Sequence, residues 1–355
     1  MVFTHPFCSH QARVPCMTTL KAFTRTLLLS ASLLVGGLTA TATYAETPAP
    51  VTYGGSTWFS SFPVWVGIDK GIFKKHGLDV KWQLFGTSSS RMSAMVSGNL
   101  DFAASSAIPA LSLMAAGSKS FEVISEPDSF VTVQGVFTNG AIKDVAGLKG
   151  KKIGVTYASS GHILILDLLK QAQMDPNKDV MLLNMPTQEM PAALKTGQID
   201  AAVAWSPTFD ILQRQGSTLL ADDTQFSLYK QFKIGTGPDI LIASRAYTKE
   251  HPKESQAFVD SYMEAIAFIK AHPEEAAQSI TELTKLPVDE QLKTINAIDW
   301  HDLAEQKQTL IETQSFQNGL KQLAAFMVEN KQLSKVPAVD DWFNTSFVSH
   351  AESRP

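Results

Sequence analysis

Cysteine is nearly missing from this chain of 355 residues: Cys8 and Cys16 are the only two, and none follows residue 16. Beyond that point the chain therefore has no disulfide, no thiolate metal ligand and no thiol nucleophile. The sequence also has no HExxH motif, no EF-hand loop and no GK[ST] phosphate loop. We therefore expect no metal, no cofactor and no catalytic residues.

Clusters of basic residues are also missing, and the chain carries a net charge of −4. The first 45 residues contain three basic side chains, Arg13, Lys21 and Arg25, and no acidic one, so the remainder carries −7. An acidic chain without basic patches is a poor partner for nucleic acid or for an anionic membrane surface. We expect neither as a partner.

Only one long apolar run is present, and it lies near the start of the sequence. Lys21 and Arg25 precede an apolar stretch over 27–38, and small residues follow as far as Ala45. This order is typical of a secretory signal peptide. The run is shorter than the ~20 residues that a membrane-spanning helix needs. We expect residues 1–45 to be a signal peptide with Met17 as the initiator, cleaved near Ala45.

Strand-like and helix-like patterns alternate through most of the remaining chain. Strand patterns with alternating or continuous apolar residues are separated by helix patterns that begin with hydroxyls and end on glycine. The strands are expected at 51–55, 78–85, 100–105, 151–159 and 179–185, and the helices at 62–77, 88–98 and 161–174. This alternation predicts an α/β fold with a largely parallel sheet.

One α/β half-unit occurs twice in the sequence. Residues 92–104 align without gaps with residues 191–203, so that Gly98 and Asp101 match Gly197 and Asp200. Each copy is expected in a different lobe. Because ligands bind beyond the carboxyl ends of strands in such sheets, the two hydroxyl-rich ends should face a shared cleft.

Two further strand-like stretches, 131–138 and 237–245, flank the second copy. We expect them to be crossover strands that form a hinge. This divides the chain into a first part of lobe 1 (46–137), lobe 2 (138–237) and a return to lobe 1 with C-terminal helices (238–355). From Thr248 onward, apolar residues recur at helical spacing.

The motifs MVSGNLDFAASSAIPAL, LKGKKIGVTYASSGHILIL and LKTGQIDAAVAWSPTFDIL together resemble periplasmic substrate-binding proteins of ABC importers. The resemblance covers residues 51–348. Within that superfamily the chain is similar to the taurine, alkanesulfonate and nitrate group, and most of all to the taurine-binding branch. The resemblance implies a monomeric, two-lobed periplasmic binding protein fold of type II. It also implies hinge closure on a small anionic or zwitterionic ligand, which is delivered to a permease in the inner membrane.

A helix start is expected after a strand at Ser159, Ser160 and Gly161, where free N–H groups and the helix dipole favour an anion. The same loop matches the ligand loop of the family that the chain resembles. Ser105 and Ser106 are expected to play the equivalent part from lobe 1.

Aromatic and titratable side chains complete the expected site. His162 follows the serine loop and could donate to a sulfonate oxygen. Trp205 is expected to form a wall of the cleft and to donate its indole N–H, with Trp58 and Phe59 opposite. Asp239, at the second crossover, is expected to pair with a ligand ammonium, a role that the resemblance also implies.

These residues point to binding without chemistry. The expected ligand is a small organosulfonate, either taurine or a short alkanesulfonate. A binding protein for nitrate, a sulfate ester, an aromatic sulfonate or a pyrimidine is the alternative, because the tryptophans would suit a flatter ligand. A third hypothesis is an enzyme resembling the thiamine-pyrimidine synthases, which use pyridoxal phosphate. The signal peptide and the lack of a convincing Lys–His pair speak against it.

Overall fold

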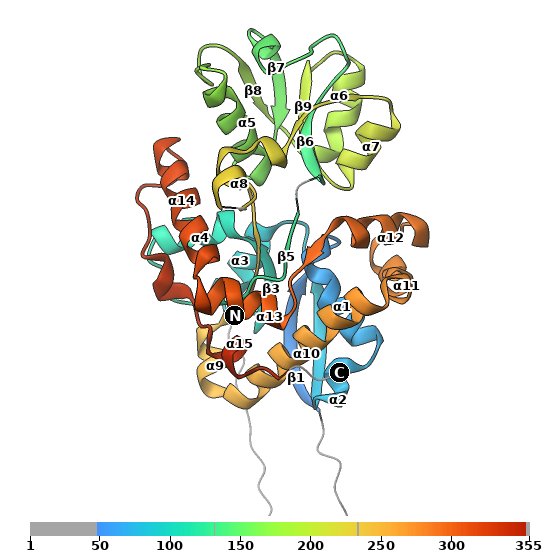
Figure 1. Ribbon diagram of the computed structural model, residues 1–355, viewed down its shortest axis with the longest axis vertical. Helices are drawn as coiled ribbons and strands as arrows, with labels where there is room; N and C mark the ends of the chain where they lie inside the picture. The colour runs from blue at the N-terminus through green and yellow to red at the C-terminus, as the bar shows by residue number, and fades with distance from the viewer. Residues whose placement is uncertain (1–47, 131, 233, 353–355) are drawn as a thin grey trace, which may run out of the picture. The chain divides into compact units, whose positions relative to one another are not determined.

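Two five-stranded sheets organise the residues that the computed structural model describes, 48–130, 132–232 and 234–352 (Figure 1). The expected signal peptide lies outside them. The first sheet has the strand order β2-β1-β3-β11-β4. Strands β1, β2 and β3 run parallel, and β11 runs antiparallel to β3 and β4. Its strands are β1 (Ala49–Gly55), β2 (Leu78–Leu84), β3 (Phe102–Ser106), β4 (Phe121–Ser125) and β11 (Asp239–Ser244).

The second sheet repeats this plan with the order β10-β6-β9-β7-β8. Strand β7 runs parallel to β8 and β9, whereas β6 runs antiparallel to β9 and β10. Its strands are β6 (Gln134–Thr138), β7 (Lys152–Val155), β8 (Met181–Asn184), β9 (Ala201–Trp205) and β10 (Thr218–Asp222). A short pair, β5 (Asp128–Ser129) and β12 (Asp299–Trp300), stands apart from both sheets.

Helices separate the strands, as the alternation predicts. Around the first sheet these are α1 (Phe62–Asp69), α2 (Ile72–Lys75), α3 (Ser88–Val96) and α4 (Ala107–Ala115), and around the second α5 (Ser160–Gln171), α6 (Met190–Lys195), α7 (Thr208–Arg214) and α8 (Ser227–Phe232). The single helix predicted over 62–77 is wrong. Gly71 adopts a left-handed φ of 70°, which ends one helix and begins the next.

The repeated half-unit has the same local structure in both sheets. Gly98 and Gly197 follow α3 and α6 with φ of 76° and 73°, which glycine adopts without strain. One carboxylate oxygen of Asp101 then accepts the N–H of Thr52 in β1 at 2.7 Å, and Asp200 accepts the N–H of Lys152 in β7 at 2.9 Å. The shared Gly and Asp therefore fix the entry into β3 and β9 in the same way.

The chain crosses between the two sheets twice. Strand β6 pairs with β9 from Gln134 to Thr138 and with β10 from Gly135 to Thr138. We therefore propose that lobe 2 begins near Gln134 rather than at the expected residue 138. It returns after α8, and β11 begins at Asp239 in the first sheet.

The C-terminal part is helical and packs on the first lobe, as expected (Figure 1). In α10 the ring of Phe258 stacks on Phe102 of β3 with centroids 3.9 Å apart. Lys170 of α5 pairs with Glu329 of α14 at 2.7 Å, so this part also touches the second lobe. Its helices are α9 (Arg245–Glu250), α10 (Pro252–Ala271), α11 (Pro273–Thr284), α12 (Val288–Ala297), α13 (Leu303–Lys307), α14 (Ser315–Glu329) and α15 (Ser346–His350).

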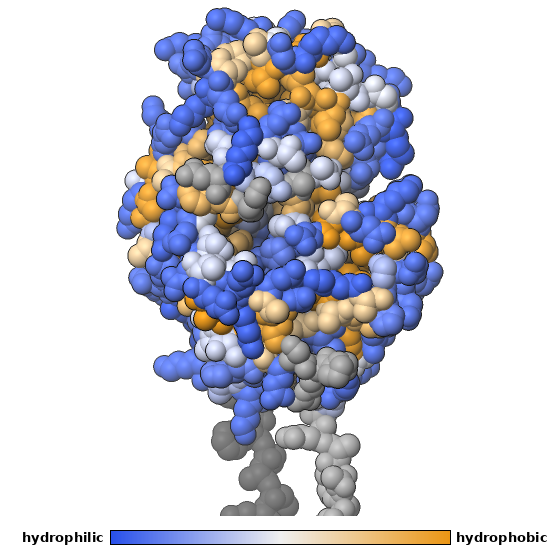
Figure 2. Space-filling view, viewed as in Figure 1, coloured by the Kyte–Doolittle hydropathy of each residue, from blue (hydrophilic) through white to orange (hydrophobic). Residues whose placement is uncertain are grey.

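The face shown in Figure 2 is mainly hydrophilic, with apolar patches between charged side chains. Within residues 48–352, as far as they are described, every helix is too short or too polar to cross a bilayer.

Candidate functional site

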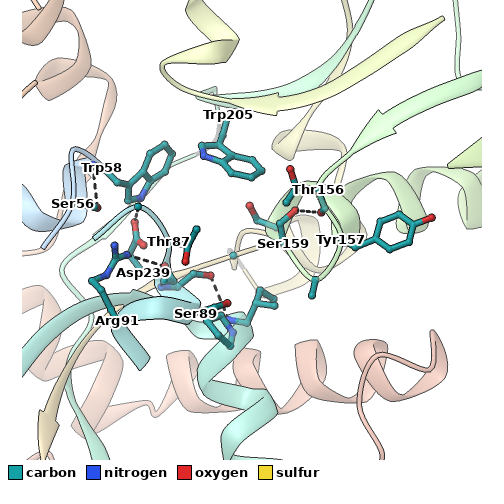
Figure 3. Close-up of a pocket in the computed structure, with 18 of the residues that line it drawn as sticks. Ser56, Trp58, Thr87, Ser89, Arg91, Thr156, Tyr157, Ser159, Trp205 and Asp239 are labelled. Carbon is teal, nitrogen blue, oxygen red and sulfur yellow. Dashed lines mark hydrogen bonds between the residues drawn. The ribbon is translucent and has the colours of Figure 1, made fainter. Parts of the chain in front are cut away.

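A cavity of about 310 Å³ lies where the ends of β1, β3, β7 and β9 face one another (Figure 3). Both lobes contribute to its wall, which is mainly hydroxyl-bearing and aromatic. The described residues that line it are Ser56, Trp58, Gly86, Thr87, Ser88, Ser89, Arg91, Ser106, Ile108, Pro109, Phe130, Thr156, Tyr157, Ala158, Ser159, Ser160, Trp205, Gly237 and Asp239. The cleft expected from the repeated half-unit is therefore present.

Six of the ten residues predicted from the sequence lie on this wall: Trp58, Ser106, Ser159, Ser160, Trp205 and Asp239. They come from both lobes and from the second crossover. In Figure 3, Trp205 lies at the top of the cavity between Trp58 on one side and Ser159 on the other, and Asp239 lies below Trp58.

Phe59 and Ser105 lie behind the wall rather than on it. The Phe59 ring is buried, and its centroid lies 4.0 Å from that of Trp58 and 5.0 Å from that of Phe130. Phe59 therefore supports the aromatic wall from behind. Ser105 is fully buried, and its hydroxyl donates to the carbonyl of Ser106 at 3.0 Å. Side chains alternate across a strand, so Ser105 and Ser106 cannot both face the cavity.

Gly161 and His162 also lie outside the described wall of this cavity. Gly161 is buried behind Trp205, and a Cβ there would lie 3.7 Å from the indole. His162 stacks on Tyr157 with ring centroids 4.6 Å apart, and its Nδ1 lies 3.1 Å from Gln332. It faces a different hollow, because successive residues of a helix point about 100° apart.

The Asp239 carboxylate and the Trp58 indole form one end of the cavity. Asp239 is 2% exposed, and its Oδ2 accepts the N–H of Trp58 at 2.6 Å. Burial raises the pKa of Asp239 to about 7, and the Trp58 hydrogen bond and the Arg91 charge act in the opposite direction. Trp58 thus orients the carboxylate as well as forming the wall.

Arg91 is a charged wall residue that the sequence reading missed. It is 3% exposed; its Nε donates to the Ala104 carbonyl at 2.6 Å and its Nη2 to Ser88 Oγ at 2.9 Å. Its Nη1 is buried and has no acceptor among the described residues. Burial lowers the pKa of Arg91. The available signal was an arginine four residues before Met95, on the apolar face of the predicted helix.

Three helices begin at this cavity. A side-chain hydroxyl caps each of them. In α3 the Thr87 hydroxyl accepts the N–H of Ser90 at 3.1 Å, and in α4 the Ser106 hydroxyl accepts that of Ile108 at 3.4 Å. In α5 the Ser159 hydroxyl accepts the N–H of His162 at 3.3 Å. The first N–H groups of a helix have no partner within the helix, and the dipole adds positive potential. In α4, however, the Ala107 N–H donates to the Pro238 carbonyl at 2.8 Å, the cap uses the Ile108 N–H and Pro109 has none. The starts of α3 and α5 are therefore the two that can donate to an anion.

The lobes come into contact at Gly237. A Cβ on this glycine would lie 2.5 Å from Ser160 Cβ and 3.2 Å from Ser106 Oγ. Ser106 of lobe 1 and Ser160 of lobe 2 therefore meet on either side of the crossover. Only glycine leaves room for this approach, because carbon atoms do not come so close without displacement.

The Ser160 hydroxyl donates its proton to a hydrogen-bond network at the crossover. Ser160 donates to Gln134 Oε1, and Gln134 Nε2 donates to Asp223 Oδ1 at 3.0 Å. Thr236 also donates to this carboxylate, at 2.8 Å, and burial raises the pKa of Asp223 to about 7. The Ser160 hydroxyl can therefore accept from a ligand, whereas its backbone N–H is the group that can donate.

We expect Ser160→Ala to leave the affinity for a sulfonate within about threefold of the original. It removes no donor that faces the cavity, but it leaves buried Gln134 Oε1 unsatisfied, which should destabilise the fold by ~1 kcal/mol. Titration calorimetry and thermal unfolding check the two effects. A large loss of affinity with unchanged stability would show that the Ser160 hydroxyl donates to the ligand and not to Gln134.

The family model described as NMT1/THI5 like matches residues 58–276. This segment is more than half of the chain and contains every described wall residue except Ser56. The chain belongs to the NMT1/THI5-like family.

Two relatives of this NMT1/THI5-like chain confirm the resemblance noted in the sequence. One is the putative aliphatic sulfonates-binding protein of Bacillus subtilis, 28% identical over 302 residues, or 81% of this chain and 84% of that protein. The other is the taurine-binding periplasmic protein of Escherichia coli, 24% identical over 277 residues, or 76% of this chain and 83% of that protein.

Among solved structures, the chain is similar to the periplasmic aliphatic sulphonate binding protein SsuA of Escherichia coli. The TM-score is 0.69 at 19% identity, and the match covers 84% of this chain and 92% of that one. The likeness shows the fold. This NMT1/THI5-like chain has the two-lobed α/β periplasmic binding protein fold, as expected.

Proposed function

We propose that this protein is the solute-binding component of an ABC importer and captures a small organosulfonate, either taurine or a short alkanesulfonate. The observation that carries the proposal is the convergence of the starts of α3, from the first lobe, and α5, from the second, on one cavity lined by both lobes. The names of the relatives, sulfonate-binding and taurine-binding, support the same ligand class.

The sulfonate is held at the helix starts. Its oxygens accept hydrogen bonds from the first N–H groups of α3 and α5, at Ser89 and Ser160, and from the indole N–H of Trp205, which has no acceptor within the described residues. Hydrogen bonds to a charged group contribute about 1.5–3 kcal/mol each when both partners are desolvated.

The amine of taurine pairs with the Asp239 carboxylate. The carboxylate has lone pairs beyond the one that Trp58 uses. A zwitterion is then paired at both ends, which a buried ligand requires because an unpaired buried charge costs several kcal/mol.

Binding proceeds by hinge rotation that brings the two lobes together over the ligand. The crossovers near Gln134 and Gly237 are the hinge, and a permease in the inner membrane recognises the closed surface. In this account the protein is exported to the periplasm, acts as a monomer and binds no nucleic acid. Neither lysine nor histidine is among the described wall residues, which supports binding rather than pyridoxal-phosphate-dependent synthesis.

A thermal-shift screen tests the ligand class. The panel contains taurine, alkanesulfonates, aromatic sulfonates, sulfate esters, nitrate, amino acids and pyrimidines. A ligand at 100 times its Kd adds about 2.7 kcal/mol to the free energy of unfolding. We expect the shift with sulfonates. A shift confined to pyrimidines or nitrate would refute the proposal.

Taurine affinity should rise with pH. Because the pKa of Asp239 is raised to about 7, the carboxyl is mostly protonated at about pH 6 and mostly ionised at about pH 8. An ammonium binds the ionised form, so taurine affinity should rise about tenfold across this range. Ethanesulfonate has no amine and should show no such rise in calorimetric titrations. A flat profile for taurine would contradict the role of Asp239.

A further inference from the structure

Two buried charges at one end of the cavity do not pair with each other. Asp239 and Arg91 are 2% and 3% exposed, and Figure 3 shows them beside each other below Trp58. Each charge affects the pKa of the other group, yet no ion pair within 4.0 Å joins them among the described residues. Leaving opposite charges buried and unpaired is costly.

Each of the two groups has an unused position. Arg91 uses Nε and Nη2 within the protein, and its Nη1 has no acceptor in the described part of the chain. Asp239 accepts from Trp58 through Oδ2, which leaves lone pairs for further donors. The missing partner therefore has an acceptor for Arg91 and a donor for Asp239.

We propose that the ligand is a sulfonated α-amino acid of the cysteate type. Its carboxylate accepts from Arg91 Nη1, its ammonium donates to Asp239, and its sulfonate lies at the starts of α3 and α5. The proposal rests on the proposed function, because it keeps the sulfonate and the amine where that function places them. Arg91 is then a specificity-determining residue.

Taurine leaves this arrangement incomplete. With its sulfonate at the helix starts and its amine at Asp239, nothing accepts from Arg91 Nη1. A carboxylate on the carbon that carries the amine supplies that acceptor. Planar carboxylates also match the fixed geometry of a guanidinium.

The test is calorimetric titration of the full chain with L-cysteate, taurine and 3-sulfopropanoate, which carries the carboxylate but no amine. We expect L-cysteate to bind at least about tenfold more tightly than either of the others, since each lacks one charged hydrogen bond. Arg91→Lys should weaken L-cysteate about tenfold or more and taurine by less than about threefold. Arg214→Lys is the matched control, because Arg214 of α7 is exposed and not among the wall residues, and lysine keeps the charge that pairs with Glu290 of α12; it should change neither.

Equal affinity of the unaltered protein for L-cysteate and taurine would overturn the inference while the proposed function stands. Equal weakening of both ligands by Arg91→Lys would also overturn it, because Arg91 would then act only by tying α3 to β3. If no sulfonate binds, the proposed function fails and the inference fails with it. If the Arg91→Lys variant does not fold, the relative affinities of the unaltered protein for L-cysteate, taurine and 3-sulfopropanoate still test the inference.

Discussion

Asp239→Asn should weaken taurine binding by roughly ten- to a hundredfold and leave ethanesulfonate within about threefold. Asparagine keeps the shape of the side chain and an oxygen that can accept from the Trp58 indole, which lies 2.6 Å from the carboxylate. It removes the negative charge that pairs with the ammonium, a hydrogen bond of about 1.5–3 kcal/mol. Titration calorimetry at about pH 8, where Asp239 is ionised, measures the difference.

Ethanesulfonate is the internal control for this variant, because it shares the sulfonate and lacks the amine. If both ligands lose affinity equally, Asp239 maintains the shape of the cavity and does not pair with the amine. The empty variant should unfold at the same or a higher temperature at about pH 8. The reason is that burial of the ionised Asp239 raises its folded pKa, so stability falls as the pH rises through about 7.

Gly237→Ala should reduce the affinity for every sulfonate by at least about tenfold. The new Cβ would lie 2.5 Å from Ser160 Cβ, a contact that only a displacement of one lobe relieves. Ser160 Cβ is fixed to the start of α5 and cannot move aside as the tip of a long side chain would. Overpacking of this kind costs about 1–3 kcal/mol when the site cannot relax. The ligand-free protein can relax by opening, so its unfolding temperature should change little.

Gly235→Ala is the matched control, since a Cβ there would approach nothing closer than the Phe130 carbonyl at 3.7 Å. It should leave affinity nearly unchanged. Small-angle X-ray scattering adds a second readout: saturating taurine should make the unaltered protein more compact and the Gly237→Ala variant less so. Normal affinity in Gly237→Ala would show that the lobes do not need to approach at this glycine.

The sheets and the cavity were predictable from the sequence because their signals are local. Alternation of strand and helix patterns gave the α/β class, and the shared Gly and Asp of the repeated half-unit marked the entries to β3 and β9. Hydroxyls at the beginnings of the helix patterns over 88–98 and 161–174 marked the capped starts of α3 and α5. The interruption at Gly71 was missed because the apolar pattern continues across it.

The parts of the site that were missed depend on directions in space that sequence adjacency does not give. Ser105 and His162 are neighbours of wall residues, but strand alternation and helix rotation turn them away. The position of Arg91 on the apolar face of its helix indicates burial, but its hydrogen bonds to Ala104 and Ser88, which place it on the wall, come from the fold. The hydrogen bond that the Ser160 hydroxyl donates depends on Gln134 and Asp223, which are distant from it in the sequence.

A crystal structure of the protein grown with taurine tests the central claim most directly. The account predicts the sulfonate in the cavity between the lobes, with its oxygens about 2.7–3.2 Å from the N–H groups of Ser89 and Ser160. The amine should lie against Asp239. A sulfonate bound elsewhere, such as in the hollow beside His162, or an unoccupied cavity at saturating taurine would contradict it.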